Sequence, residues 1–291
     1  MKPLRLSLLS LLLPALSAAS CPRPLLKSLT SLYVTSQTSG NPSALHNLSL
    51  SSLNFLYIEN NKLLDIRSPS STLSKPITID FHRSIHDTEQ CATLTEIIAA
   101  NNPGHPYVIH TRMVFSPSSD TQAIPLFIES VVTDEGDWLF NATGTLQLNA
   151  PEKWDPIPLE KQEPRALIKS LGDAYFDRFG NVNVTVPWGA PCYRLEGGLP
   201  AKGELLANGE CVMVWPSTIK VPYRRYVVDE EYGAVDIFMG FPGLDRTQGQ
   251  EPMPDSHLFR VEQGKIKYCH TVSACVKDGC GLNGTTFPGM E

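Results

Sequence analysis

Two stretches in the last quarter of the chain decide its fold: PYRRYVVDEEY, from Pro222 to Tyr232, and HLFRVEQGKIKYCH, from His257 to His270. The first interleaves aromatic and β-branched residues with charges, which predicts a strand. The second predicts a β-hairpin, because Gly264 follows a polar residue and the pair suits a two-residue turn. In the register set by this turn, Val261 faces Ile266, Phe259 faces Tyr268, and His257 faces His270.

This register places all six side chains on one face of the predicted sheet. The other face then carries Leu258, Arg260, Glu262, Lys265, Lys267 and Cys269. The apolar face must be buried, and His257 and His270 would lie opposite each other there, with Cβ atoms roughly 5 Å apart. The two histidines are either an acid-base pair in a pocket or a buried, hydrogen-bonded structural pair.

Composition and the first residues indicate where the protein works. The 291 residues leave room for two domains, and a net charge of -6 gives no basic footprint, so nucleic acid is not an expected partner. Residues 1–20 combine a positive start, an apolar run and a small-residue segment, which predicts a signal peptide. The apolar run is too short to span a membrane, and no later stretch approaches the required length. We therefore expect a secreted protein or a resident of the secretory lumen.

Sequons and cysteines fit that compartment. Glycosylation is predicted at Asn47, Asn141, Asn183 and Asn283. Seven cysteines in an oxidising compartment should mostly pair, although connectivity is not readable from sequence. The expected disulfides are Cys21 to Cys91, Cys192 to Cys211, and Cys275 to Cys280. That leaves Cys269 free, on the outer face of the hairpin.

The chain also contains a degenerate internal repeat. The apolar stripe of a predicted helix, Leu25 to Tyr33, recurs 142 residues later from Leu167 to Tyr175, and Asp87 recurs at the same offset as Asp229. The hairpin recurs at an offset of 128, with residues 133–138 matching residues 261–266, so that Glu129 and Ala142 would replace the two histidines. Two copies of a helix followed by strands predict an α+β fold. The expected boundaries are 21–149 and 165–280, with a Pro-rich linker at 150–164 and a tail at 281–291.

Four segments carry a resemblance to a known family: Asp173 to Asp177, Cys192 to Gly198, Arg225 to Glu230, and Asp255 to Val261. They resemble a family of secreted fungal proteins with tandem NTF2-like domains, also called SnoaL-like or ketosteroid-isomerase-like. The resemblance implies two cystatin-like cones, each a helix packed on a curved antiparallel sheet. It also implies a role like that of the dimerising cyclases of maleidride and phomoidride clusters, which couple alkyl maleic or citraconic anhydride units.

Such coupling needs a base, donors for a developing oxyanion and an anchor for an anion. The matching residue types in the second copy are Asp229 or Glu230 as base, His257 or His270 as base or donor, and Tyr226 and Tyr268 as donors. Arg225 would hold the anion, and Glu230 is also a candidate substrate-binding residue. None of these matches the isomerase motif position by position, and their charges are also those of a solvated strand end. No cofactor and no metal are expected.

Two functions therefore stay open. The first is a lyase or cyclase that acts on small polyketide-derived anhydrides, with a partner protein of the same pathway as a further possibility. The second is a non-catalytic secreted protein or effector that binds a small molecule in the same cones.

We predict that Cys192 and Cys211 are joined in secreted material. Both cysteines lie in the segment before the Pro222 strand, and an oxidising compartment favours their pairing. Peptide mapping without reduction should recover the linked peptides. Two free thiols at these positions would contradict the predicted compartment.

Overall fold

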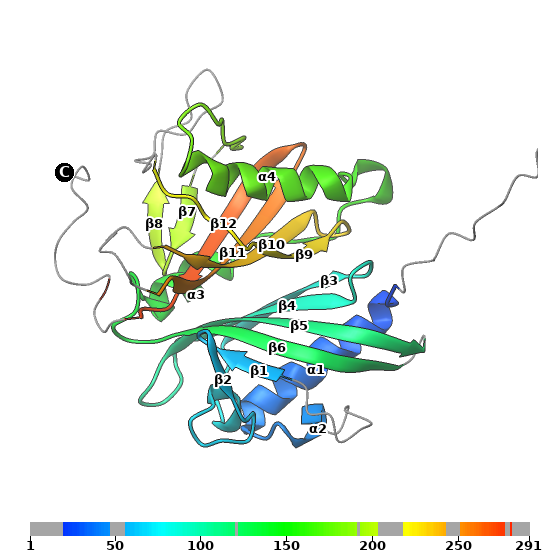
Figure 1. Cartoon of the computed structure of the whole chain (residues 1–291), viewed down its shortest axis with the longest axis vertical. Coiled ribbons are helices and arrows are strands. Elements are labelled where there is room, and N and C mark those ends of the chain that lie inside the picture. The colour runs from blue at the N-terminus through cyan, green and yellow to red at the C-terminus, as the bar shows by residue number, and fades with distance from the viewer. Residues whose placement is uncertain are drawn as a thin grey trace, which may run out of the picture.

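The computed structural model describes residues 20–46, 56–119, 122–190, 193–202, 218–242, 251–276 and 280. These residues form four layers, in the order helix α4, sheet B, sheet A and helix α1 (Figure 1). The two sheets face each other, and each long helix covers the outer face of its own sheet. The expected mixed α+β class is therefore confirmed.

The helices are α1 (Arg23–Ser39), α2 (Ser43–His46), α3 (Ala142–Asn149) and α4 (Arg165–Arg178), with 3-10 turns η1 (Thr72–Ser74) and η2 (Leu159–Lys161). Sheet A contains β1 (Leu56–Glu59), β2 (Lys62–Leu64), β3 (Phe81–Asp87), β4 (Ala92–Ala99), β5 (Tyr107–Ser119) and β6 (Gln122–Thr133). Sheet B contains β7 (Tyr193–Glu196), β8 (Leu199–Lys202), β9 (Arg225–Asp229), β10 (Ala234–Phe241), β11 (Met253–Glu262) and β12 (Lys265–Ser273).

Both sheets have the same topology. The strand order is β2-β1-β6-β5-β4-β3 in sheet A and β8-β7-β12-β11-β10-β9 in sheet B. In each sheet the described neighbours are antiparallel, except for β1 with β6 and β7 with β12, which are parallel. Corresponding strands can therefore be compared position by position.

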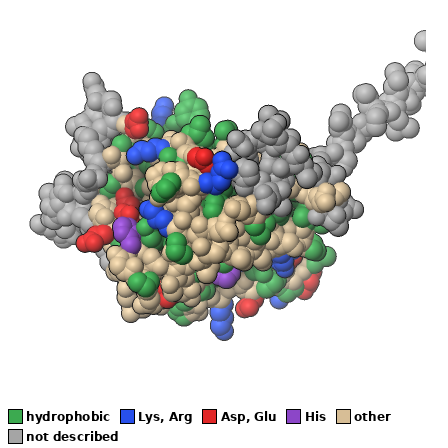
Figure 2. Space-filling model, turned by 90° about the horizontal axis from the view of Figure 1, so that it is seen from below, with side chains coloured by type: hydrophobic (Ala, Val, Ile, Leu, Met, Phe, Trp, Pro, Cys, Tyr) green, Lys and Arg blue, Asp and Glu red, His purple; other side chains and the backbone are tan. Residues whose placement is uncertain are grey.

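Helix α1 forms where the sequence predicts it. Proline in its first turn suits the helix start, and Gly40 ends the helix in the left-handed conformation with φ of 64°. Leu26, Leu29 and Tyr33 are buried against sheet A. The outer side carries serines and threonines whose hydroxyls donate to main-chain carbonyls four residues earlier. On this side of the molecule lysine and arginine side chains are scattered, not gathered (Figure 2).

The hairpin forms at Gln263 and Gly264, but the register differs from the predicted one. Both turn residues have positive φ, and Val261 pairs with Ile266 as expected. A β-bulge at Lys267 then shifts the pairing by one residue, so that Arg260 faces Tyr268, Leu258 faces His270, and His257 faces Thr271. Because one residue of shift exchanges the faces of a strand, His257 and His270 lie on opposite faces of sheet B.

The bulge is a repeated feature of the fold. In sheet A, Val114 pairs with Phe127 and Phe115 with Pro125, which leaves Leu126 as the extra residue at the corresponding place. The predicted offset of 128 is therefore wrong: residues 133–138 follow β6 into a turn, and the true counterpart of the β11–β12 hairpin is β5–β6.

The strand registers identify equivalent positions in the two sheets. Ala92 and Ala234 begin β4 and β10, and they pair with Val114 and Arg260, respectively. Counting from these pairs, the counterpart of His257 is Thr111 and not Glu129. Counting from the bulges, the counterpart of His270 is Glu129 and not Ala142.

An ion pair connects each of the two long helices to the sheet of the other copy. Arg23, the first residue of α1, donates to Asp229 of sheet B at 2.6 and 2.9 Å. Arg165, the first residue of α4, donates to Asp87 of sheet A. Both aspartates have fully buried side chains. These equivalent pairs cross over, so each sheet supplies the counter-charge for the first residue of the helix that covers the other sheet.

The described cysteines agree with two of the expected disulfides. Cys21 is bonded to Cys91, and Cys275 to Cys280, whereas the predicted bond of Cys192 to Cys211 lies outside the described residues. Cys269 is free as expected, but it is buried against α4 and not on an outer face, because the bulge turns it inward.

The targeting and glycosylation expectations stay predictions. Asn183 is exposed, and the Asn141 side chain caps α3 by accepting a hydrogen bond from the Gly144 N–H. Asn47, Asn283 and the predicted signal peptide lie outside the described residues, apart from Ser20. Of the helices described, none is long and apolar enough to cross a membrane.

Replacing Arg23 by Met should lower the free energy of unfolding by about 2–3 kcal/mol, because Asp229 would stay buried without its cation. Arg165→Met should cost about as much, since its contact with Asp87 is equivalent. Urea denaturation of both variants measures the loss. The matched control is Arg67→Met, whose ion pair with Asp65 is more than half exposed and should contribute less than about 0.5 kcal/mol. Equal stability of the Arg23 and Arg67 variants would contradict the crossed-pair argument.

Candidate functional site

The structure does not bring the two predicted histidines together. His270 and Tyr268 point from β12 toward sheet A, where the ring of Tyr268 stacks on Trp154. His257 points from β11 toward α4. The expectation of a cross-strand histidine pair is therefore wrong, and the cause is the bulge described above.

The other predicted residues lie at the edge formed by β9. Asp229 is neutralised by Arg23, and Glu230 accepts a hydrogen bond from a main-chain N–H at the start of α4. Tyr226 donates to an aspartate of α4, and Arg225 is paired with Glu129 of sheet A. The catalytic and substrate-binding roles of the seven residues stay predictions, but they do not share one pocket.

His257 lies among aromatic side chains on the α4 face of sheet B. Its imidazole is 5.2 Å from the ring of Tyr175 and 4.8 Å from that of Phe176, measured between centroids. Its Nδ1 is 3.1 Å from Asp255 Oδ1 but forms no hydrogen bond with any described residue, and its side chain is 5% exposed. A carboxylate thus lies directly beside the imidazole.

Tyr175 and Arg194 place a neutral donor and a fixed cation beside this histidine. Burial raises the pKa of Tyr175 well above its ordinary range, so its hydroxyl stays protonated. That hydroxyl accepts a hydrogen bond from Arg194, whose Nε is 2.7 Å from Glu196. The indole N–H of Trp188 is buried in the same cluster and forms no hydrogen bond with any described residue. The cluster therefore contains a base, two donors and a cation within largely apolar surroundings.

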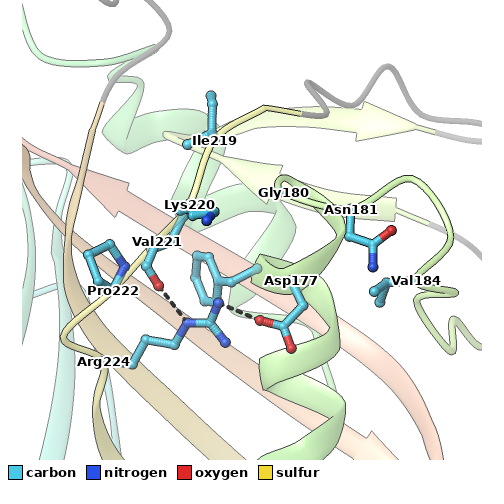
Figure 3. Close-up of a pocket in the computed structure, with 10 residues that line it drawn as sticks. Asp177, Gly180, Asn181, Val184, Ile219, Lys220, Val221, Pro222 and Arg224 are labelled. Carbon is cyan, nitrogen blue, oxygen red and sulfur yellow. Dashed lines mark hydrogen bonds and ion pairs between the residues drawn. The ribbon is translucent and has the colours of Figure 1, made fainter.

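A cavity of about 360 Å³ opens next to this cluster, at the end of α4 (Figure 3). It is lined by Phe176, Asp177, Gly180, Asn181, Val184, Ile219, Lys220, Val221, Pro222 and Arg224. Arg224 is paired with Asp177 at 2.7 Å, whereas Lys220, the other cation of the cavity, forms no ion pair with a described residue. Phe176 both lines the cavity and contacts His257, and its ring separates the two.

The corresponding face of sheet A lacks the histidine and the arginine. Thr111 occupies the position of His257 and bonds the hydroxyl of Tyr33, which is the counterpart of Tyr175. Tyr57 occupies the position of Arg194, as the parallel pairing of β1 with β6 and of β7 with β12 shows. The acid-base cluster is therefore a property of sheet B alone.

His270 belongs to a different, buried network between the sheets. Burial disfavours its charged form, but Glu152 at 2.9 Å and Glu96 at 3.0 Å raise its pKa to about 9. Glu96 also accepts from Arg83 and Asn149. The side chain of His270 is 3% exposed, and the geometry of the network is that of a structural ion cluster.

Sequence reasoning missed Tyr175, Arg194, Glu196 and Asp255 as site residues. Tyr175 looked like ordinary core packing, because it lies on a helical apolar stripe. A signal was present, however, since three of the four segments that carry the family resemblance contain these residues and meet on the α4 face. Among the described residues, no three histidine, cysteine, aspartate or glutamate side chains are grouped as metal ligands would be.

Comparisons with known proteins give limited guidance. Residues 161–273 match the family described as "Domain of unknown function (DUF8021)", a segment that contains α4 and all of sheet B. No curated protein matches the chain. A solved structure described as a "putative ketosteroid isomerase" from Parabacteroides distasonis is 13% identical, covering 40% of this chain and 96% of its own, with a TM-score of 0.26. A likeness this distant carries no inference about activity.

His270 should stabilise the folded protein below about pH 6.5 and lose that contribution as the pH rises through about 9. The sign follows from a pKa that is higher in the folded state, which binds the proton more tightly than the unfolded chain. The difference in unfolding free energy between wild type and His270→Gln should therefore shrink between pH 6 and pH 9.5. His105→Gln is the control, since His105 and its partner Asp134 are exposed. A pH-independent difference would contradict the assignment.

Proposed function

We propose that the chain consists of two NTF2-like cones in tandem, residues 21–149 and 165–280, and acts in the secretory pathway as one of the secreted fungal proteins it resembles. The shared strand order of the sheets and the helix on each outer face support the two cones. Two disulfides are compatible with an oxidising compartment. The second cone carries the function, because it alone has the acid-base cluster.

The function we propose is cofactor-independent carbanion chemistry on a small, apolar, anionic molecule. The observation that carries it is the cluster of His257, Tyr175 and Arg194 beside the α4 cavity. His257 would be the base, and the neighbouring Asp255 carboxylate would stabilise the imidazolium that forms. Tyr175 would donate to the developing oxyanion, and Arg194 would supply the stabilising positive charge.

Within this class, we propose the dimerising cyclase reaction of the maleidride type. His257 removes a proton from the carbon vinylogous to an anhydride carbonyl, and the C–H electron pair moves into a dienolate. The dienolate carbon then forms a C–C bond with a second alkyl maleic or citraconic anhydride, and the imidazolium returns its proton to the product. A turn of the Phe176 ring would open His257 to the cavity, whose volume suits one such unit with a short alkyl chain.

One observation favours the alternative, a non-catalytic protein that binds a small molecule. The side chain of His257 is only 5% exposed, and Phe176 stands between it and the cavity. If Phe176 does not move, the cavity offers apolar walls and the ammonium of Lys220 but no base aimed at a ligand. Such a site would hold an amphiphilic anion without transforming it.

Proton exchange separates these functions without requiring a partner protein. Wild-type protein in D2O should incorporate deuterium at the allylic carbon of an alkyl citraconic anhydride, as mass spectrometry would measure. His257→Gln should slow this exchange at least ~100-fold, because glutamine cannot take the proton. The control His82→Gln changes an exposed histidine on β3 and should exchange at the wild-type rate.

Each outcome of this experiment has a definite meaning. Ligand binding without exchange in the wild type would establish the binding protein and overturn the cyclase. Exchange that survives in His257→Gln would overturn the assigned base. If a folded His270→Gln variant loses the exchange while His257→Gln exchanges at the wild-type rate, the site lies on the face between the sheets and the assigned base is wrong.

A further inference from the structure

The two sheets create two equivalent grooves at their shared interface, and the described residues fill only one of them. Equivalent positions follow from the registers and from the bulges described above. Arg225 of β9 corresponds to Arg83 of β3, and Phe127 of β6 corresponds to Tyr268 of β12. Each groove is therefore bordered by an arginine from the edge of one sheet and an aromatic ring from the other sheet.

The linker between α3 and α4 occupies the first groove. The indole of Trp154 stacks on Tyr268 at 5.9 Å, and the guanidinium of Arg83 lies 4.3 Å from the indole centroid. Glu152, two residues earlier, accepts from the Trp154 N–H and contacts His270. An aromatic ring and a carboxylate are thus the groups that this groove holds.

The second groove is open as a cavity of about 400 Å³. It is lined by Leu56, Ile58, Asn61, Phe127, Glu129 and Arg225. Three of these walls are apolar, and they come from two neighbouring strands of sheet A. No described segment of the chain occupies the place that Trp154 takes in the other groove.

Two arginines, Arg225 and Arg112, pair with the Glu129 carboxylate at this cavity, and Arg112 also interacts electrostatically with the buried Asp236 of β10. Arg225 donates to Glu129 while its side chain remains 34% exposed. Arg112 lies against the lining residues, with its guanidinium 5.0 Å from the Phe127 centroid and its Nη1 3.5 Å from Glu129. Arg112 is 8% exposed, and its Nε has no hydrogen-bond partner among the described residues. A buried, incompletely bonded guanidinium behind an apolar cavity is a feature that an anion would satisfy.

We propose that this groove binds a small aromatic carboxylate. Its ring would stack on Phe127, as Trp154 stacks on Tyr268, and its carboxylate would bond Arg225 and lie close to the incompletely hydrogen-bonded guanidinium of Arg112. The site is separate from the α4 cavity, and the proposal does not depend on the proposed carbanion chemistry.

Indole-3-acetate is the probe, because it joins the two groups that Trp154 and Glu152 present in the filled groove. We expect the full-length protein to bind it with a Kd on the order of 1 mM, as the ligand efficiency of a drug-like molecule of this size implies. Saturation-transfer NMR and titration calorimetry measure the binding. Neutral indole should bind at least fivefold more weakly, because it lacks the carboxylate.

Variants locate the binding. Arg225→Gln and Phe127→Ala should each weaken it at least fivefold, and Ile58→Trp should abolish it by filling the cavity. Leu126→Ala is the matched control, since Leu126 neighbours Phe127 but does not line the cavity. Lys220→Gln should also leave the affinity unchanged, because Lys220 lines the α4 cavity.

Thermal unfolding of each variant checks that the fold is retained. Ile58→Trp and Arg225→Gln act through different groups, so if one of them fails to fold the other still tests the proposal. No binding by the wild type at 10 mM would overturn the proposal. Equal binding by Ile58→Trp, or loss in Lys220→Gln with Ile58→Trp unaffected, would place the ligand elsewhere and overturn it as well.

Discussion

The crossed ion pairs of Arg23 with Asp229 and of Arg165 with Asp87 are the constraint on which the rest of the structure depends. A carboxylate taken fully out of water is costly unless a cation and hydrogen bonds accompany it. Each aspartate also accepts a main-chain N–H, from His86 and Val228 respectively, so each pair fixes a strand of the opposite sheet as well as a helix end. Because each buried aspartate depends on a helix and an edge strand of the other copy, the aspartates would lose these partners if the two copies separated. The contact between the sheets, and everything built at it, follows from this exchange.

The sequence predicted the parts of the fold that depend on local pattern. The 142-residue offset correctly aligned α1 with α4 and Asp87 with Asp229, because helical stripes and strand ends leave a periodic trace. Asp229 was interpreted as a base or as part of a solvated strand end, since nothing local shows that an arginine far away in the chain will reach it. Partners that are distant in sequence are a tertiary property, which periodicity does not encode.

The candidate site was missed for a related reason. Turn chemistry correctly located Gln263 and Gly264, but it fixes the register only as far as the first irregularity. The bulge at Lys267 places the apolar thiol of Cys269 against α4 and turns Tyr268 toward Trp154, which is a better burial for both side chains. A prediction from strict alternation of side chains along a strand cannot anticipate an extra residue. One bulge was therefore enough for the prediction to place His270 on the wrong face and to miss the contact of His257 with Tyr175.

The comparison of equivalent positions shows how one scaffold supports two different surfaces. On the outer face, sheet A has Thr111 and Tyr57 where sheet B has His257 and Arg194, so the histidine and the arginine occur in sheet B alone. On the inner face, the two grooves differ in whether the linker fills them. The linker that joins the two copies reaches only the groove next to the point where it leaves sheet A. A chain that joins two similar units once must leave the second groove without that covering segment. The groove beside Phe127, which no described segment fills, is therefore a consequence of the connectivity. The buried guanidinium of Arg112 lies beside this groove, whereas the filled groove has Leu258 at the equivalent position.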